Sequence, residues 1–187
     1  MNKILFEETV AKESIVRTAL YSFTRFVRFL SWLGAVFSGF LMLGITAYIL
    51  LEIVLRAFFQ ASTNVLDEIV GYGVGAMTFM TLAYTLCTNQ HIQITLLRDR
   101  VSESTRVKLD VAALLFSLAT TSVVAWYIGR SAFRAFERGT VSATVARVPL
   151  WIPESVFLAG LVLLALAMLV SLLNLLILKK AVNTWTH

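Results

Sequence analysis

Few side chains in this sequence are equipped for covalent or metal chemistry. Its one cysteine, Cys87, rules out an internal disulfide and lies in an apolar stretch, where we expect a buried, inert thiol. The two histidines, His91 and His187, lie outside the apolar segments, so no pair of imidazoles is available inside a membrane to hold a haem. We therefore expect no enzyme activity, no cofactor and no metal site.

Charged side chains stand at the ends of apolar segments instead. Glu52 and Arg56 are four residues apart with the acid on the N-terminal side, the order that favours an ion pair on a helix. Asp67 and Glu68 open the next apolar segment, where their carboxylates face the positive end of a helix dipole, and Asn64 is a candidate N-cap. A structural pair and a capped helix with solvated acids explain these residues, and contact with a partner protein is the alternative.

The elements that must position these residues are long apolar segments. Of the 187 residues, 58% are hydrophobic and 14% charged, and the mean hydropathy of +0.81 is too high for a small soluble domain. Four stretches lack Asp, Glu, Lys and Arg: 29–51, 69–90, 111–129 and 155–178. Each is near the roughly 20 residues that a helix needs to cross the hydrocarbon. Lipid offers no partner for an unpaired backbone amide, so these stretches must be helices.

We predict an all-α membrane protein with four transmembrane helices. A cytoplasmic segment, 1–28, precedes a transmembrane domain, 29–178, and a cytoplasmic tail, 179–187, follows it; the spans lie at about 29–54, 65–90, 109–130 and 153–178. In the first segment apolar residues recur at helical spacing among cationic residues. This pattern predicts an amphipathic helix on the membrane surface, with a simple extension of the first span as the alternative.

Lysine and arginine place both termini in the cytoplasm. The N-terminal segment, the loop after the second span and the tail hold eleven of these residues, against five on the opposite side. Two of the five, Arg130 and Arg134, can snorkel at a helix end or meet an anionic partner. The net charge of +5 favours a membrane surface and not nucleic acid, because no separate basic domain carries it.

The span interiors indicate packing more than transport. Gly71 and Gly75 in the second span, and Ser117 and Thr121 in the third, have the small-residue spacing that permits close helix contact. An ion-coupled transporter usually keeps ionisable groups in the membrane interior, where a charge costs at least roughly 2.5–3.5 kcal/mol. None of the four uncharged stretches contains one, so the sequence is better suited to anchoring than to carrying ions.

Short motifs then point to one family. An Arg-aromatic pair follows the first span, an acidic pair opens the second, a His-Ile run closes it, and a proline-rich turn precedes the last; these motifs lie at 52–59, 66–69, 89–94 and 148–153. Together they resemble the small membrane subunit of TRAP (tripartite ATP-independent periplasmic) transporters, the DctQ-like or Q subunit. Leu66 stands where that family often has tryptophan, and Gln93 and Thr95 replace charged positions of the His-Ile run.

The resemblance implies a fixed scaffold in a bacterial or archaeal cytoplasmic membrane. Q subunits act beside a large M subunit, which carries the sodium and substrate sites, and a periplasmic P subunit delivers an organic acid. On this basis Arg56, Asp67 and Glu68, with Glu52, are candidates for fixing the outer ends of the first two spans or for meeting the P subunit, and His91 would close the second span. Two other classes remain: a stand-alone small transporter or channel, and a membrane anchor of another complex.

Overall fold

The structure, a computed structural model, describes residues 2–88 and 103–178, which form four helices. They are α1 (Asn2–Phe59), α2 (Leu66–Cys87), α4 (Glu103–Arg138) and α5 (Trp151–Leu178). All four are long and apolar enough to cross a membrane, and the described residues contain no strand beyond one isolated bridge between Val141 and Pro149. The prediction of an all-α protein with four helices of membrane-spanning length is confirmed.

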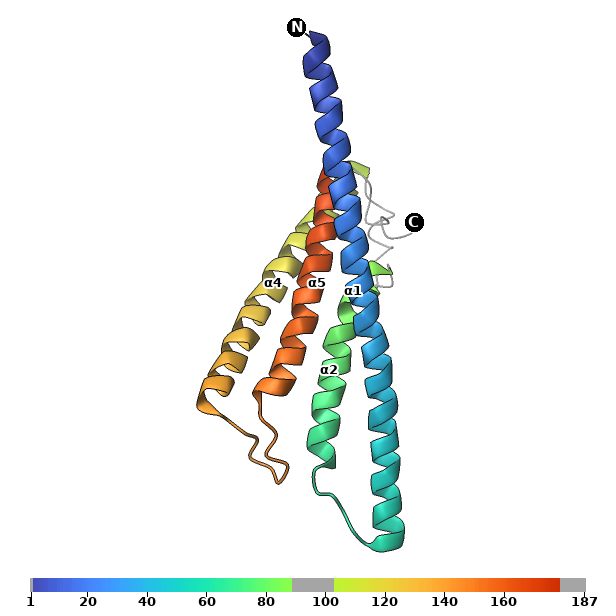
Figure 1. The fold of residues 1–187 in the computed structure, drawn as a ribbon, viewed down its shortest axis with the longest axis vertical. Helices are drawn as coiled ribbons and strands as arrows, with labels where there is room; N and C mark the ends of the chain where they lie inside the picture. The colour runs from blue at the N-terminus through green and yellow to red at the C-terminus, as the bar shows by residue number, and fades with distance from the viewer. Residues whose placement is uncertain (1, 89–102, 179–187) are drawn as a thin grey trace.

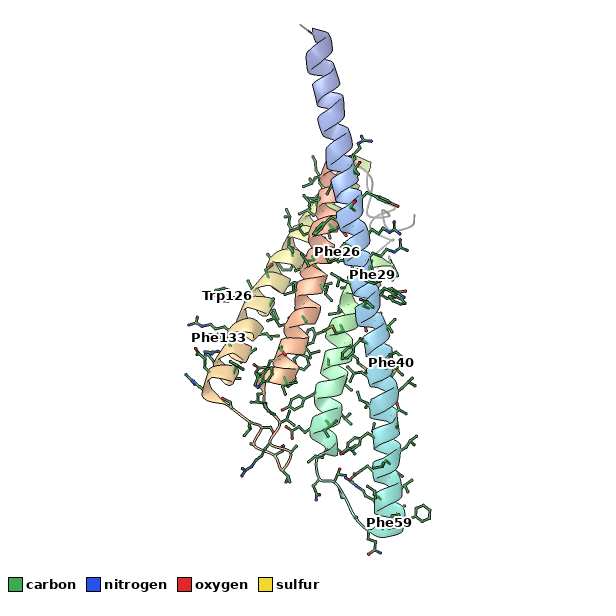
Figure 2. The ribbon with its side chains drawn as sticks, in the orientation of Figure 1. Phe26, Phe29, Phe40, Phe59, Trp126 and Phe133 are labelled. Atoms are coloured by element: carbon green, nitrogen blue, oxygen red, sulfur yellow. The ribbon has the colours of Figure 1, made fainter. Side chains whose placement is uncertain are left out.

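The helices lie side by side in the order α1, α2, α5, α4 (Figure 1). In this layer α5 packs against both α2 and α4, and it also touches α1. Of the 18 residues in the most apolar part of α5, 33% are buried, against 6% in the corresponding part of α4. α5 is therefore the central helix and α4 an outer one. Large apolar side chains of α1 and α4 consequently face outward, as Phe40 and Trp126 do in Figure 2.

The N-terminal segment continues the first span without a break. The segment 2–59 contains no proline and is one helix of 58 residues, about 87 Å long at about 1.5 Å per residue, which far exceeds the hydrocarbon thickness of about 30 Å. Figure 1 shows its first turns projecting past the other helices. The backbone therefore follows the alternative that the sequence left open, an extension of the first span, and placement of residues 1–28 on the membrane surface stays a prediction.

Helix ends differ from the predicted span ends because apolar length reports only the part of a helix that lies in hydrocarbon. α4 extends past the predicted 109–130 at both ends, and α1 extends past 54 to Phe59. The predicted tail, 179–187, and His91 lie outside the described residues. Two connections, 60–65 and 139–150, share one end of the layer (Figure 1), which we call the paired-loop end.

The core is a seam of small and polar residues along α5. Leu164, Ala167, Ser171 and Asn174 are all at most 6% exposed, and their spacing of three and four residues places them, with Gly160, on one face of the helix. The rest of the core comes from α1 and α2 and includes Val27, Ala83 and Cys87. Burial of Cys87 agrees with the prediction from sequence, and its thiol donates to the Ser31 hydroxyl at 3.7 Å.

Candidate functional site

At the paired-loop end, Glu52 is the centre of a dense hydrogen-bond cluster. Its side chain is only 1% exposed, and its Oε1 accepts from Arg56 Nε at 3.0 Å, which forms the ion pair expected from the spacing of the two residues. Ser62 Oγ donates to the same oxygen at 2.5 Å, and the Thr63 hydroxyl donates to Oε2 at 2.7 Å. The buried negative charge is therefore matched by one cation and several aligned donors.

The cluster folds the connection 60–65 back onto the end of α1. The backbone N–H of Thr63 donates to both Glu52 oxygens at 3.2 and 3.3 Å, and Tyr48 pairs with the Thr63 hydroxyl at 2.9 Å. The outer part of the Arg56 side chain stays in solvent, because that side chain is 58% exposed, and its Nη2 reaches Ser62 at 3.2 Å. Ser62 and Thr63 were missed from sequence, since nothing local to them indicates a carboxylate ten residues away.

The structure corrects the capping prediction for α2. The N-cap is Val65, which makes no side-chain capping bond, and Asn64 lies one residue earlier with a φ of 55°. The Asn64 side chain instead donates to the Ser62 carbonyl at 3.4 Å. Asp67 and Glu68 do occupy the first turn of α2, as the sequence indicates, and Asp67 is exposed. The carboxylates thus stand at the positive helix end without help from Asn64.

Glu68 joins the second connection, 139–150, to the first turn of α2. The Thr144 hydroxyl, in the second connection, donates to Glu68 Oε2, and Thr144 also pairs with Ser142 at 3.0 Å. On the neighbouring helices, Ser131 of α4 donates to Glu154 Oε1 of α5 at 3.1 Å. The Glu52 cluster thus ties the end of α1 to the first connection, the Thr144 bond ties the second connection to α2, and the Ser131 bond ties α4 to α5.

The predicted glycine pair on α2 is packed at only one of its two residues. A side chain at Gly71 would meet nothing within 4 Å, whereas a Cβ at Gly75 would lie 2.8 Å from the Phe157 ring of α5. The tightest backbone approach, which the sequence reading missed, is at Gly160 of α5, where a Cβ would lie 2.5 Å from the backbone carbonyl carbon of Phe79. The sequence signal for this contact was the helical spacing of Gly160, Leu164, Ala167 and Ser171.

The predicted small residues of the third span do face α5. Thr121 is buried, 9% exposed, and its hydroxyl lies 3.9 Å from Met168 Sδ of α5. Ser117, one turn earlier, is half-buried. Small side chains at this spacing let α4 approach α5 closely. α5 is the one described helix against which α4 packs.

Comparison with known proteins now bears on this arrangement. A family model described as "Tripartite ATP-independent periplasmic transporters, DctQ component" matches residues 45–178, more than half of the chain. No curated protein and no solved structure matches. This chain belongs to the DctQ family. The matched region of this DctQ chain begins within α1 and ends with α5, so it includes the whole paired-loop end.

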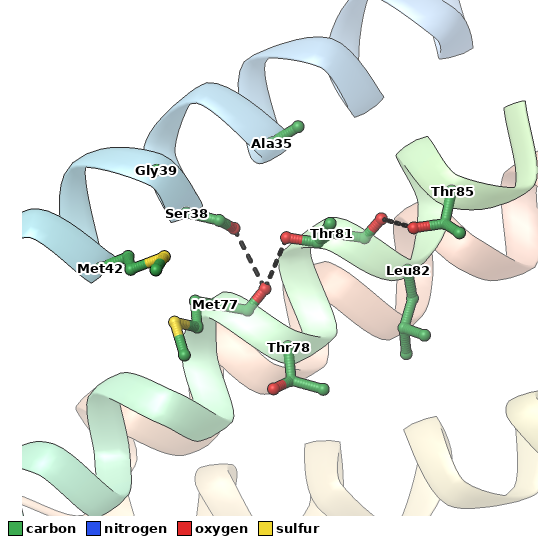
Figure 3. Close-up of a pocket in the computed structure, with 9 residues that line it drawn as sticks. All are labelled: Ala35, Ser38, Gly39, Met42, Met77, Thr78, Thr81, Leu82 and Thr85. Atoms are coloured by element: carbon green, nitrogen blue, oxygen red, sulfur yellow. Dashed lines mark hydrogen bonds between the residues drawn. The ribbon is translucent and has the colours of Figure 1, made fainter. Parts of the chain in front are cut away.

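In the DctQ chain, residues of α1 and α2 also line an open groove of about 430 Å³ (Figure 3). Its polar groups are already bonded: Ser38 and Thr81 both donate to the Met77 carbonyl, at 3.1 and 2.8 Å, and Thr85 donates to the Thr81 carbonyl at 3.0 Å. The groove therefore presents mainly methyl and methylene groups, an apolar surface without free donors for a polar substrate.

No set of three or more His, Cys, Asp or Glu residues in the described part of this DctQ chain is grouped to hold a metal ion. The polar cluster at the paired-loop end instead bonds loops to helix ends. This cluster has a structural role, because Glu52 is nearly inaccessible and each of its two carboxylate oxygens already accepts hydrogen bonds. His91, the remaining predicted site residue, lies outside the described residues.

Proposed function

We propose that this chain, the small membrane subunit of a TRAP transporter by family, acts as a fixed scaffold. It supports a large M subunit that performs sodium-coupled uptake of an organic acid, which a periplasmic P subunit delivers. We place it in the cytoplasmic membrane with both termini in the cytoplasm, a topology that rests on the distribution of lysine and arginine.

One observation carries the scaffold role: the stretches 29–51, 69–90, 111–129 and 155–178, which we assign to the hydrocarbon, contain no Asp, Glu, Lys or Arg. In the uncharged stretches of the four helices, the buried polar groups are hydroxyls and an amide, and these are bonded to backbone or to neighbouring helices. The Thr24 hydroxyl of α1, for example, accepts from Asn174 Nδ2 of α5 at 3.4 Å. A moving ion or acid would need free charges or exchangeable ligands there, and this packing supplies neither.

Transport assays on the isolated chain test the proposal. Liposomes that contain only the purified chain should take up no organic acid, for example succinate, a sialic acid or a sulfonate, when a sodium gradient is applied. The positive control is the same liposome preparation made with the chain and its large membrane subunit, supplied with the cognate binding protein. Sodium-driven uptake by the chain alone would refute the scaffold role.

A second experiment tests the partners. The chain, expressed with the large membrane protein and the secreted binding protein encoded beside it, should purify as a complex with the large subunit. Recovery of the chain alone, with sodium-coupled uptake unchanged after its deletion, would show that it is dispensable to that transporter and would reopen the class of its partner.

A further inference from the structure

A cationic stripe runs along the outward face of α4 at the paired-loop end. Arg130, Arg134 and Arg138 follow one another at intervals of four residues, so their side chains share one face of the helix. All three are exposed, and no ion pair or side-chain hydrogen bond found among the described residues includes them. Glu137 lies on the same face and is also exposed, so the stripe keeps an excess of two positive charges.

This face points away from the rest of the chain. Thr121, Ala132 and Ala135 are the buried residues of α4 and lie on the opposite side of the helix, toward α5. The aromatic side chains next to the stripe are strongly exposed: Trp126 is 74% and Phe133 61% exposed, and both project outward in Figure 2. Within the described residues, these arginines therefore bond to no other part of the chain.

The depth of the stripe matches the headgroup layer of a bilayer. The uncharged stretch 111–129 is about 28 Å long at about 1.5 Å per residue, close to the hydrocarbon thickness of about 30 Å. Counted along α4 from this stretch, Arg130 stands at the hydrocarbon edge and Arg134 about 6 Å farther out, within a headgroup layer of about 5–8 Å on each side. Trp126, one turn inside, occupies the level where aromatic belts form.

We infer that Arg130 and Arg134 bind the phosphate of phospholipid headgroups and so fix the depth of α4 in the membrane. A guanidinium group offers paired donors that match two phosphate oxygens, and an exposed helix face flanked by aromatic and aliphatic side chains suits the attached acyl chains. Because α4 has only α5 as a firm neighbour, such an anchor would hold the outer helix of the layer in place. This inference stands independently of the scaffold role.

The test uses the full chain in bilayers of phosphatidylcholine and phosphatidylglycerol that contain a trace of photoactivatable phosphatidylglycerol, whose reactive group lies near the glycerol. Mass spectrometry locates the labelled residues. We expect labelling of α4 around 126–138, and Arg130→Gln or Arg134→Gln should each lower it about fivefold, the equilibrium change expected for about 1 kcal/mol per arginine near an anionic surface. Arg147→Gln, which removes the same charge from the nearby connection, is the matched control and should leave the labelling unchanged.

Two further comparisons, one with lysine variants and one with a lipid that lacks phosphate, complete the experiment. Arg130→Lys and Arg134→Lys keep the charge without the paired donors and should retain part of the labelling, with helix content and melting temperature unchanged. A photoactivatable diacylglycerol, which lacks the phosphate, should label α4 weakly. Equal labelling by the two lipids, or equal labelling of wild type and both Gln variants, would overturn the inference. It would equally be overturned if the arginines became protected only in a complex with an acidic protein partner.

Discussion

Glu52 shows how a single residue can organise one end of a membrane protein. A carboxylate this deeply buried is stable only where donors surround it, and here the donors come from Arg56 on the same helix and from Ser62 and Thr63 in the next connection. The connection 60–65 is thereby bonded to three side chains of α1: Glu52, which makes most of the bonds, Arg56 and Tyr48. Function at this end, whether contact with a partner or support of the two helices, depends on that fixed shape.

Glu52→Gln tests this arrangement with little change in size. The amide cannot accept from all the donors that the carboxylate serves, and its NH₂ group would face donors. We expect the melting temperature of the purified chain in detergent to fall by several degrees. The matched control is Asp67→Asn, which removes the same charge from an exposed side chain at the same end and should change the melting temperature by no more than a degree or so, because surface substitutions have small effects.

Thr144→Val removes the hydroxyl that joins the second connection to Glu68. We expect faster hydrogen exchange at the backbone amides of 140–148, since the connection loses its bond to α2, whereas exchange in the four helices should not change. Thr120→Val is the control, because the Thr120 hydroxyl bonds only to the Phe116 carbonyl of its own helix and is exposed. Unchanged exchange in the loop after Thr144→Val would show that the bond does not hold it.

At the scale of the elements, the glycines differ sharply in what surrounds them. Gly160 lets the backbones of α2 and α5 touch, Gly75 makes room for the Phe157 ring, and Gly71 faces open space. Sequence spacing places Gly71 and Gly75 on the same face of α2, but it does not reveal that a neighbouring helix covers Gly75 and leaves Gly71 open. A large residue at Gly75 would disturb this chain itself before it disturbed any partner.

Gly160→Ala and Gly71→Ala make a matched pair, since each adds one methyl group to a helix glycine. We expect Gly160→Ala to destabilise the chain by about 1–3 kcal/mol, because its Cβ would force the backbones of α2 and α5 apart. Gly71→Ala should be neutral or stabilising by up to about 1 kcal/mol through helix propensity. Unfolding titrations in mixed micelles measure both, and equal stability of the two variants would contradict the close α2–α5 contact.

At the scale of the whole molecule, four helices bring the start of the first span and the end of the last to the same end of the layer (Figure 1). We propose, from the cationic excess of the sequence, that this end lies in the cytoplasm. A fluorescent protein fused after His187 should therefore fluoresce, and alkaline phosphatase fused there should be inactive. Phosphatase inserted in the connection 139–150 should be active, and the reverse pattern would invert the proposed topology.

The layer also explains why this chain suits a scaffold. Its two broad faces are open, with large apolar side chains outward on α1 and α4, so lipid or another membrane protein must cover them. Helices whose uncharged stretches lack Asp, Glu, Lys and Arg can offer such faces without taking part in ion movement. Among the described helices, α4 packs only against α5, so the anchor that we infer for its arginines would act on the outer helix of the layer.

The sequence by itself determined the class of protein and the four helices, because apolar length and uncharged composition are local properties that the bilayer imposes on each helix separately. The family followed from the resemblance of its short motifs, and the family match confirms it. The sequence also indicated the Glu52–Arg56 pair, which lies within one helical turn. Only the tertiary structure brought Ser62 and Thr63 to Glu52, put Gly160 against Phe79 and ordered the helices in a layer. These contacts join residues from different elements, and in lipid they depend on how side chains interlock and not on how apolar each helix is.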